Sequence, residues 1–337
     1  MRGPFKQIPT KTPGLYVSET IPNTANVMHH VALLRNVYHT QGDHNLAANR
    51  VFTGVDDQTP TFDPKYKPFI AMLGNYLSSD SVGYMIINPN TYSVTKSTSP
   101  DDALVIERHK WMKTYTSPFG DTVDPERIGR RAGLRAQLSD GWNLAGEKGK
   151  RLDELMDKGR KILTGNLSKA FDLKDVSEKE KERYGKSEFG DAGIIAKRLI
   201  RAGAPIVLID YGNWDHHENI QERFKYDMPP LDYLLSALIE DLKDEAIVVI
   251  ASEFGRTPKI NHKKGRDHWP QSNSVVICGP NVEPGVYGKL DSQGNVLGER
   301  FNGAYLGPTI LKAAGYEIKE DRGGALSNEC LPYYPIF

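Results

Sequence analysis

The sequence has few cysteines, no net charge and no long apolar run. Its 337 residues include two cysteines, Cys278 and Cys330, which lack the CxxC spacing of a zinc or redox motif. One disulfide or two buried free thiols both fit this count, and two thiols are the simpler interpretation. The cysteines therefore do not fix the redox compartment.

The charge balance argues against a nucleic-acid partner. Lys and Arg number 43, Asp and Glu also number 43, and the formal net charge is zero, so no basic field would attract phosphates. No apolar run approaches the roughly 20 residues that span a bilayer. The N-terminus, MRGPFKQIPT, lacks the apolar core of a signal peptide. We expect no membrane span and no export signal in this chain.

Short β-branched runs predict an α/β fold. Buried strands are predicted at residues 31–37, 82–87, 206–209, 247–250 and 274–278. Helices are predicted at 24–30, 68–77, 191–202, 231–242 and 308–314, with a short one through Ala47 and Ala48. The helix at 231–242 would connect two parallel strands, the right-handed unit of a doubly wound sheet. The length suits one large domain or two smaller ones.

The middle of the chain lacks this pattern. Residues 91–129 have no clear period, and we expect loops over the sheet. Residues 127–170 predict two amphipathic helices. Together, 91–170 would form a loop and helical insertion, and the charge run at 174–186 a solvated helix face.

Polar side chains follow the two central strands. Asp210, Asp215, His216 and His217 come after 206–209, and Glu253 and Arg256 come after 247–250. In open α/β sheets, ligands bind at the carboxyl ends of the strands. We therefore expect the active site at this edge.

These residues suit a metal. Asp215 and His217, two positions apart in a loop, can both reach one ion, and Glu253, Asp267 and His268 can complete its shell. A mixed carboxylate and imidazole set favours Zn²⁺ over Mn²⁺ or Fe and fits Ca²⁺ poorly. One or two ions are expected. The alternative for a single Asp-x-His is a turn with a hydrogen-bonded side chain.

A third polar group follows the strand at 31–37. It contains His39, His44 and Asn45 near a helix N-terminus, which favours an anion. The planar guanidinium of Arg256 can bind a phosphate or sulfate through two hydrogen bonds. The alternative interpretation of Arg256 is a salt bridge inside its own loop. We therefore predict Arg256, Asn45 and His44 as catalytic residues.

Four neighbouring side chains receive no chemical role. Trp214 and Trp269 are expected either to line the pocket of the site or to pack against neighbouring side chains. His216 and His262 are expected at the surface or behind the ligands.

Three motifs carry a resemblance to a known family. GNWDHH, SEFGRTP and GRDHWP, in that order and spacing, resemble the bacterial sulfatase-like family catalogued as domain of unknown function 1501, within the alkaline phosphatase superfamily. RGPFK near the N-terminus, AFDL at Ala170, RYG at Arg183 and FGDAGIIAKRLIRAG extend the likeness over most of the chain.

The resemblance implies a three-layer α/β/α sandwich with a mainly parallel central sheet. It also implies a metal-dependent hydrolase that acts on a small anionic substrate, a phosphate or sulfate ester. By motif position, Asp215 and His217 resemble ligands of one metal, Glu253 stands at the second metal, and His268 matches a late metal-binding histidine.

The chain departs from the family pattern at the nucleophile. Related enzymes carry Ser, Thr or a modified Cys at the start of the first helix, where this chain reads His44-Asn45-Leu46. Asn45 cannot attack an ester, and Thr40 is nearby. Metal-activated water would otherwise be the nucleophile.

The chain also departs at its start. Family members usually place a twin-arginine export signal, a strand and a Gly-Gly-x-Ser-His-x-Asp segment before RGPFK, so we expect one domain over 1–337 that lacks the first strand and its acidic ligand. Either the sequence is truncated, or this version has lost part of its metal site. A non-catalytic binding or scaffold protein with an incomplete site is the alternative, and a structural domain with loop-capping histidines is a third interpretation. The sequence does not fix the oligomeric state.

Overall fold

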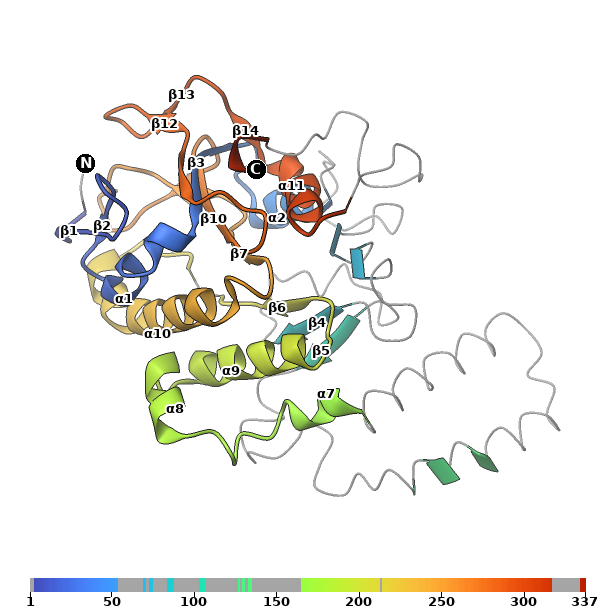
Figure 1. The fold of residues 1–337 in the computed structure, drawn as a ribbon. Coiled ribbons are helices and arrows are strands. Elements are labelled where there is room, and N and C mark those ends of the chain that lie inside the picture. Colours follow the sequence, from blue (N-terminus) through green and yellow to red (C-terminus); the bar gives the residue numbers. More distant parts are fainter. Residues whose placement is uncertain are drawn as a thin grey trace.

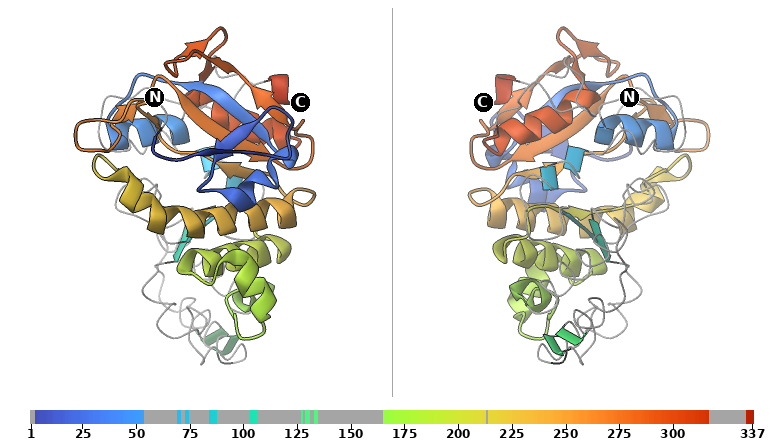
Figure 2. Two further views of the ribbon diagram at one scale, coloured as in Figure 1. Left: turned by 90° about the vertical axis from the view of Figure 1, so that its left-hand side faces the viewer. Right: turned by 90° about the vertical axis from the view of Figure 1, so that its right-hand side faces the viewer.

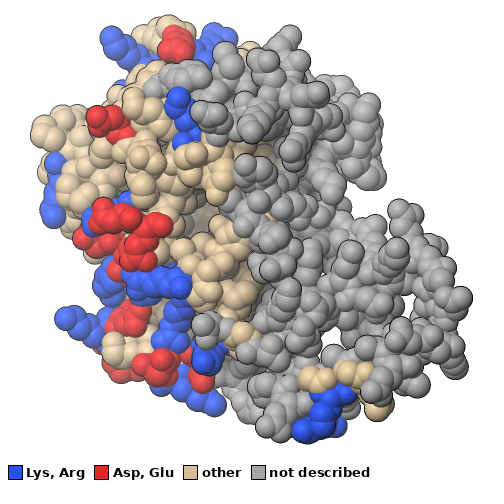
Figure 3. Space-filling view, turned by 45° about the vertical axis from the view of Figure 1, so that its right-hand side comes forward, with Lys and Arg blue, Asp and Glu red and all other residues tan. Residues whose placement is uncertain are grey.

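The computed structural model describes most of the chain outside its middle section. The described residues are 3–53, 69–70, 73–74, 84–87, 103–106, 127, 129–130, 133–134, 165–212, 214–316 and 334–337. Within them, no helix is both long and apolar enough to cross a membrane. On the face shown in Figure 3, basic and acidic side chains of the described residues lie close together.

The described residues contain both helices and strands, and short strands dominate the part after α10 (Ile220–Leu242) (Figure 1). The strands are β1 (Gln7–Pro9), β2 (Tyr16–Ser18), β3 (Ala32–Tyr38), β4 (Tyr84–Ile87), β5 (Ala103–Ile106), β6 (Val207–Ile209), β7 (Val248–Ile250), β8 (Gly255–Arg256), β9 (His268–Trp269), β10 (Asn273–Cys278), β11 (Gly285–Tyr287), β12 (Lys289–Leu290), β13 (Val296–Leu297) and β14 (Phe301–Asn302). The α-helices are α1 (Pro22–Ala25), α2 (His44–Thr53), α7 (Asn166–Lys169), α8 (Glu178–Tyr184), α9 (Glu188–Arg201), α10 (Ile220–Leu242) and α11 (Leu306–Ala313). The 3₁₀ turns are η1 (Met28–His30), η3 (Gly303–Tyr305) and η4 (Tyr334–Ile336).

The strands pair in a mixed pattern. One ladder has the order β11-β3-β10-β7, with β14 also on β3, and another has the order β5-β4-β6. All pairs within the second ladder are parallel, whereas β10 is antiparallel to both β3 and β7. The prediction of strands is confirmed. The strands on either side of α10 do not pair with each other, since β6 pairs with β4 and β7 pairs with β10.

Alternate residues of the strands face two helical layers. In β4, Met85 and Ile87 pack into a core with α9 and α10, whereas Tyr84 and Ile86 pack into a core with side chains of α2 and α11. This follows from the period of two in a strand. Figures 1 and 2 show the two helical layers on either side of the strands. The architecture is a three-layer α/β/α sandwich with a mixed central sheet.

Helices α8 and α9 have matched start and stop signals. Ser177 and Ser187 are their N-caps, and each side-chain oxygen accepts a backbone N–H from three residues on. Gly185 and Gly203 follow the helix ends with φ of 92° and 96°, a conformation that favours glycine. The predicted helix at 191–202 and its glycine stop are confirmed.

Helix α10 begins eleven residues before its predicted start because it continues through Pro229 and Pro230. A proline has no backbone N–H. Pro229 and Pro230 therefore leave the carbonyls four residues earlier, those of Lys225 and Tyr226, without their helical hydrogen bonds. Both of these residues are exposed, so water can satisfy their carbonyls. Burial of residues such as Ile220 and Leu234 stabilises the continuous helix.

The predicted insertion at 91–170 lies mostly outside the described residues. The expectation of loops at 91–129 is wrong at Ala103–Ile106, because β5 extends the sheet beside β4. Of the predicted helix at 68–77, residues 69–70 and 73–74 are helical. Cys278 is a fully buried free thiol, and Cys330 lies outside the described residues.

Candidate metal centre

Three loops and one helix start bring the predicted site residues together. The loop after β6 supplies Asp215 and His217, the loop after β7 supplies Glu253, and α2 begins at His44. Strands β8 and β9 form a hairpin in which Arg256 pairs with His268. Residues separated by up to 226 positions thus contact one another.

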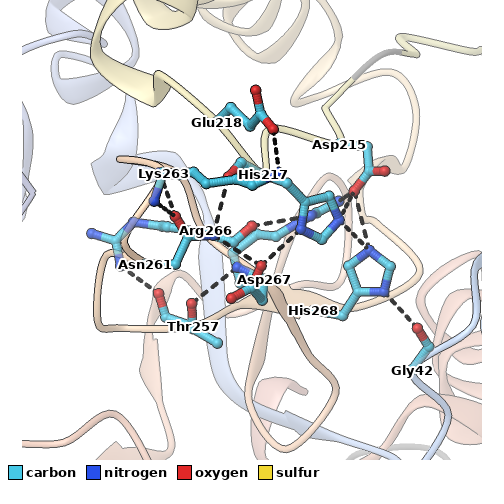
Figure 4. Close-up of polar contacts among 12 residues, drawn as sticks. Gly42, Asp215, His217, Glu218, Thr257, Asn261, Lys263, Arg266, Asp267 and His268 are labelled. Atoms are coloured by element: carbon cyan, nitrogen blue, oxygen red, sulfur yellow. Dashed lines mark hydrogen bonds and ion pairs between the residues drawn. The ribbon is translucent and has the colours of Figure 1, made fainter.

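The Asp215 carboxylate is the partner that the side chains of the cluster share, and Figure 4 shows its contacts with His217 and His268. Its Oδ1 atom is 2.7 Å from Arg256 Nη2, 2.9 Å from His217 Nε2 and 3.1 Å from His268 Nε2. Its Oδ2 atom is 3.4 Å from His44 Nε2. Three imidazole rings and one guanidinium therefore surround a single carboxylate.

Each of the three rings is anchored through its other nitrogen. The pairs are His44 Nδ1 with Glu253 Oε1 at 2.7 Å, His217 Nδ1 with Asp267 Oδ1 at 2.8 Å, and His268 Nδ1 with the Gly42 carbonyl at 2.6 Å. Carboxylate and carbonyl oxygens only accept, so each Nδ1 carries the hydrogen. Each ring thus presents Nε2 to Asp215 while an oxygen holds its Nδ1–H, and a histidine held in this way can use Nε2 as a metal ligand.

The surroundings of Asp215 keep it ionised. Partial burial by itself would raise the pKa of this carboxyl, but the hydrogen bonds from Arg256 and His268 outweigh burial. The pKa of Asp215 is therefore well below its ordinary value. A fixed negative charge lies where the three Nε2 atoms meet.

These donors fit a divalent ion. Among the described residues, His44, Asp215 and His268 each offer one ligand atom, and the three atoms lie within 4.8 Å of one another. His217 Nε2 is a fourth donor next to them, 3.1 Å from His268 Nε2. Imidazole nitrogens with one carboxylate suit Zn²⁺ and suit Ca²⁺ poorly.

Glu253 and Asp267 contact the other nitrogen of two of these rings. Both were predicted as metal ligands; in the structure they accept from the Nδ1 atoms of His44 and His217, and the three-residue donor group does not include them. Carboxylates often orient metal-binding histidines in this way. His44, predicted as a catalytic residue, is a member of the donor group.

Arg256 makes a salt bridge between two loops, not the salt bridge within its own loop that was the alternative interpretation. Nη2 binds Asp215, and Nη1 donates to the Arg266 carbonyl at 3.3 Å. The side chain is 21% exposed, so it remains open to a ligand.

Asn45 contributes to the helix start rather than to the cluster. Asp43 Oδ1 accepts the backbone N–H groups of Asn45 and Leu46, at 2.9 and 3.1 Å, and so caps α2. Within the described part of the chain, the Asn45 side chain makes no polar contact with the cluster. Its prediction as a catalytic residue therefore gains no support.

His39 was noticed in the sequence without a role. The ring is fully buried, its Nδ1 accepts the Gln41 N–H at 3.1 Å, and Nε2 therefore donates to the Glu253 carbonyl. His39 thus fixes the backbone that carries Glu253. A polar residue directly after a buried strand was the only signal for it.

The flanking aromatic residues mainly pack. Trp214 lies against Tyr211 and Phe224, with ring centroids 5.5 and 6.0 Å apart. His216 is not at the surface, because it is 8% exposed and its Nε2 lies 3.0 Å from Asp227 Oδ2. His262 is exposed, as predicted.

A family model described as "Protein of unknown function (DUF1501)" matches residues 1–321. The chain belongs to this family. The family recognised from the three motifs is thereby confirmed for this DUF1501 protein. No curated protein matches the sequence.

Solved structures resemble this DUF1501 protein at low identity. A protein in the alkaline phosphatase superfamily from Vibrio parahaemolyticus has a TM-score of 0.45 and 13% identity, over 91% of this chain and 64% of that one. Ps i-CgsB in complex with k-i-k-neocarrahexaose has a TM-score of 0.42 and 12% identity, over 89% and 67% of the two chains. BT4656, in complex with its substrate D-Glucosamine-2-N, 6-O-disulfate, has a TM-score of 0.35 and 13% identity, over 94% and 77%. Scores in this range carry no argument about activity.

Proposed function

We propose that this protein is a metal-dependent hydrolase that acts on a small phosphate or sulfate ester. The observation that supports the proposal is the set of three histidines with anchored Nδ1 atoms around one ionised carboxylate. Two of the three motifs that resemble the sulfatase-like family, GNWDHH and GRDHWP, contribute Asp215, His217 and His268 to this set.

The spacing of the nitrogens favours a cation. His217 Nε2 and His268 Nε2 are 3.1 Å apart, and both rings have their Nδ1 hydrogens directed to oxygen acceptors. Two ring nitrogens at this distance can bind one cation together once neither carries a hydrogen. Zn²⁺ is the first choice for nitrogen and carboxylate donors, with Mn²⁺ or another divalent ion as alternatives.

Arg256 is suited to hold the anionic group of the substrate. A guanidinium has five N–H bonds, and the contacts to Asp215 and Arg266 in the described residues use two of them. The remaining donors would bind phosphate or sulfate oxygens next to Asp215. A divalent ion at the three histidines would supply further stabilisation of negative charge on the ester oxygens.

The three anchoring oxygens prepare this arrangement before substrate binds. Glu253, Asp267 and the Gly42 carbonyl fix the planes of the rings, so the Nε2 atoms need little reorganisation to bind a cation. Preorganised charge is the larger part of catalysis in sites of this kind.

A non-catalytic metal-binding or scaffold function is the second candidate. Two observations favour it: α2 starts at His44-Asn45 without a hydroxyl or thiol, and Arg256 is already bound to Asp215. Ester hydrolysis distinguishes the two candidates, because both would bind a metal.

The first experiment is elemental analysis of the purified protein. We expect about one or two equivalents of a divalent metal in the wild type and loss of metal in the double variant Asp215→Ala with His217→Ala. His262→Ala is the matched control, because it removes an exposed histidine of the neighbouring loop. A wild type that takes up no zinc or manganese on dialysis would refute the metal site.

The second experiment measures hydrolysis of p-nitrophenyl phosphate and p-nitrophenyl sulfate by the metal-loaded protein. We expect turnover of at least one ester and its loss in Arg256→Ala, with metal content retained. Metal binding without any turnover would favour the non-catalytic candidate.

A further inference from the structure

We infer that Asn261 is a positioning residue that holds the Asp267–His217 pair in place. This inference rests on the proposed metal site and adds to it a residue that no motif identified. Asn261 does not face Asp215; it acts through Asp267 and through the backbone of His217.

One amide group contacts both members of the pair (Figure 4). Asn261 Nδ2 donates to Asp267 Oδ1 at 3.0 Å and to the His217 carbonyl at 3.0 Å. The same Asp267 oxygen accepts from His217 Nδ1 at 2.8 Å. The side chain of Asn261 therefore ties the carboxylate to the backbone of the histidine that it orients.

The other end of the amide folds the loop. Asn261 Oδ1 accepts the backbone N–H groups of Lys263 and Gly265, at 3.0 and 2.9 Å. Since backbone N–H groups only donate, the oxygen must face them and the NH₂ group must face Asp267 and His217. The orientation of the amide follows from its partners.

The loop that carries Asn261 is joined to the segment that carries His217. The backbone bonds are Arg266 N–H to the His216 carbonyl at 3.0 Å, Asn219 N–H to Lys263 at 3.1 Å, and Ile220 N–H to Lys264 at 2.9 Å. Gly265 packs so closely that a Cβ atom there would lie 2.0 Å from the carbonyl carbon of His217. The two segments therefore form one unit.

This support matters because the pair is open to solvent. The Asp267 side chain is 52% exposed and the His217 side chain is 39% exposed. An exposed pair of this kind is weak by itself, since water competes for both partners. The two donor bonds from Asn261 restrict the carboxylate to the position in which it accepts from His217 Nδ1.

Asn261→Asp tests the inference with little change of shape. The remaining oxygen can still accept from Lys263 and Gly265, so the loop turn is kept. The NH₂ donor becomes a second carboxylate oxygen, which loses both bonds and repels Asp267. Asn23→Asp is the matched control, because Asn23 Nδ2 donates to Asp232 at 2.9 Å in the contact of α1 with α10.

Two measurements on the full-length chain decide the outcome. The first is the tautomer of His217 in the metal-free, ¹⁵N-histidine-labelled protein, measured at about pH 8, above the ordinary pKa of a histidine side chain. We expect the Nδ1–H form in the wild type and in Asn23→Asp, and a mixture of forms in Asn261→Asp. The second is zinc affinity by competition, which we expect to fall about 10- to 100-fold in Asn261→Asp alone.

An unchanged His217 tautomer and unchanged zinc affinity in Asn261→Asp would overturn the inference. Should Asn261→Asp fail to fold, Asp267→Asn removes the negative charge of the acceptor that Asn261 and His217 share. A mixture of His217 tautomers and a lower zinc affinity in Asp267→Asn would support the inference, and no change in either would overturn it. A wild type that binds no zinc would refute the proposed function, whereas the tautomer in the metal-free protein would still decide the role of Asn261.

Discussion

At the residue scale, each histidine of the cluster depends on a different oxygen. Glu253 holds His44, Asp267 holds His217, and the Gly42 carbonyl holds His268. A substitution at one anchor should therefore loosen one ring and leave the other two in place.

Glu253→Gln tests this dependence at His44. The substitution removes the negative charge that strengthens the Nδ1–H bond, so His44 becomes a weaker and less oriented donor. We expect zinc affinity to fall about 10- to 100-fold, measured by competition with a chelating dye. Glu222→Gln, on the exposed side of α10, is the control and should leave the affinity unchanged. Equal affinity in both variants would contradict an orienting role for Glu253.

Gly265→Ala tests the close approach behind His217. An added Cβ would lie 2.0 Å from backbone atoms of His217, so the two segments must separate. We expect the free energy of unfolding to fall by about 1–3 kcal/mol in urea titrations. Gly42→Ala is the control, because no described residue lies within 4 Å of a Cβ added there. Similar stabilities for the two variants would show that the contact at Gly265 relaxes without cost.

The sequence predicted the members of the cluster better than their roles. Strand ends placed Asp215, His217 and Glu253 at one edge because polar residues follow buried runs at those points. Which oxygen meets which ring nitrogen depends on side-chain directions in three loops, and no spacing along the chain encodes these directions. For the same reason, Asn261 looked like an ordinary loop residue.

At the element scale, α8, α9 and α10 are joined by one charged network. Asp241 of α10 binds Arg183, accepts from the Tyr184 hydroxyl at 2.8 Å and contacts Lys197 Nζ at 3.0 Å. The ammonium group of Lys197, which is almost fully buried, also binds Glu180. Burial would raise the pKa of Asp241, but the three hydrogen bonds outweigh it and lower the pKa to about 2.

Asp241→Asn should remove a pH-dependent contribution to stability. Because the folded pKa is below the ordinary value of 3.8, the ionised Asp241 stabilises the fold above about pH 4, and this contribution is lost as pH falls from 4 to 2. We expect the variant to lose about 2 kcal/mol at neutral pH and to show a flatter dependence below pH 4 in urea titrations.

Asp244→Asn is the control for the charged network. Asp244 is 82% exposed and lies near the end of the same helix. It should change neither the stability nor its pH dependence. An equal loss of stability in Asp241→Asn and Asp244→Asn would mean that the change in net charge, and not the contacts of Asp241, causes the effect.

Three features of the fold were not predicted from the sequence, and each has a physical reason. The strand at Ala103–Ile106 stands among residues with many Ser, Thr, Pro and Asp, so its four residues gave no visible run. The direction of β10 depends on which neighbours it pairs with, and a short apolar run is compatible with both directions. Prolines normally end a helix, but tertiary burial on both sides of Pro229 and Pro230 prevails in α10.

At the scale of the whole molecule, the site joins parts of the chain that belong to different layers. His44 starts α2 on one side of the sheet, and the segment of Asp215 and His217 leads into α10 on the other. A bound cation would therefore crosslink these layers. Ligands that bind only the folded state stabilise it by mass action.

Metal removal should lower the melting temperature. At zinc concentrations about 100-fold above the dissociation constant, the stabilisation is about 2.7 kcal/mol. We expect a rise of several degrees in thermal melts with zinc relative to melts with EDTA. The double variant Asp215→Ala with His217→Ala should give the same melting temperature in both. A zinc-dependent rise in the double variant would place the binding elsewhere.

The contact between His268 and Gly42 spans 226 positions along the chain. During synthesis, the N-terminal half of the cluster must therefore wait, without its partners, until the β8–β9 hairpin has been made and has docked. Contacts of such long sequence separation form late because the chain entropy of closing the loop must be overcome first. Metal capture would then mark the end of folding, and chains halted before His268 would lack the complete site.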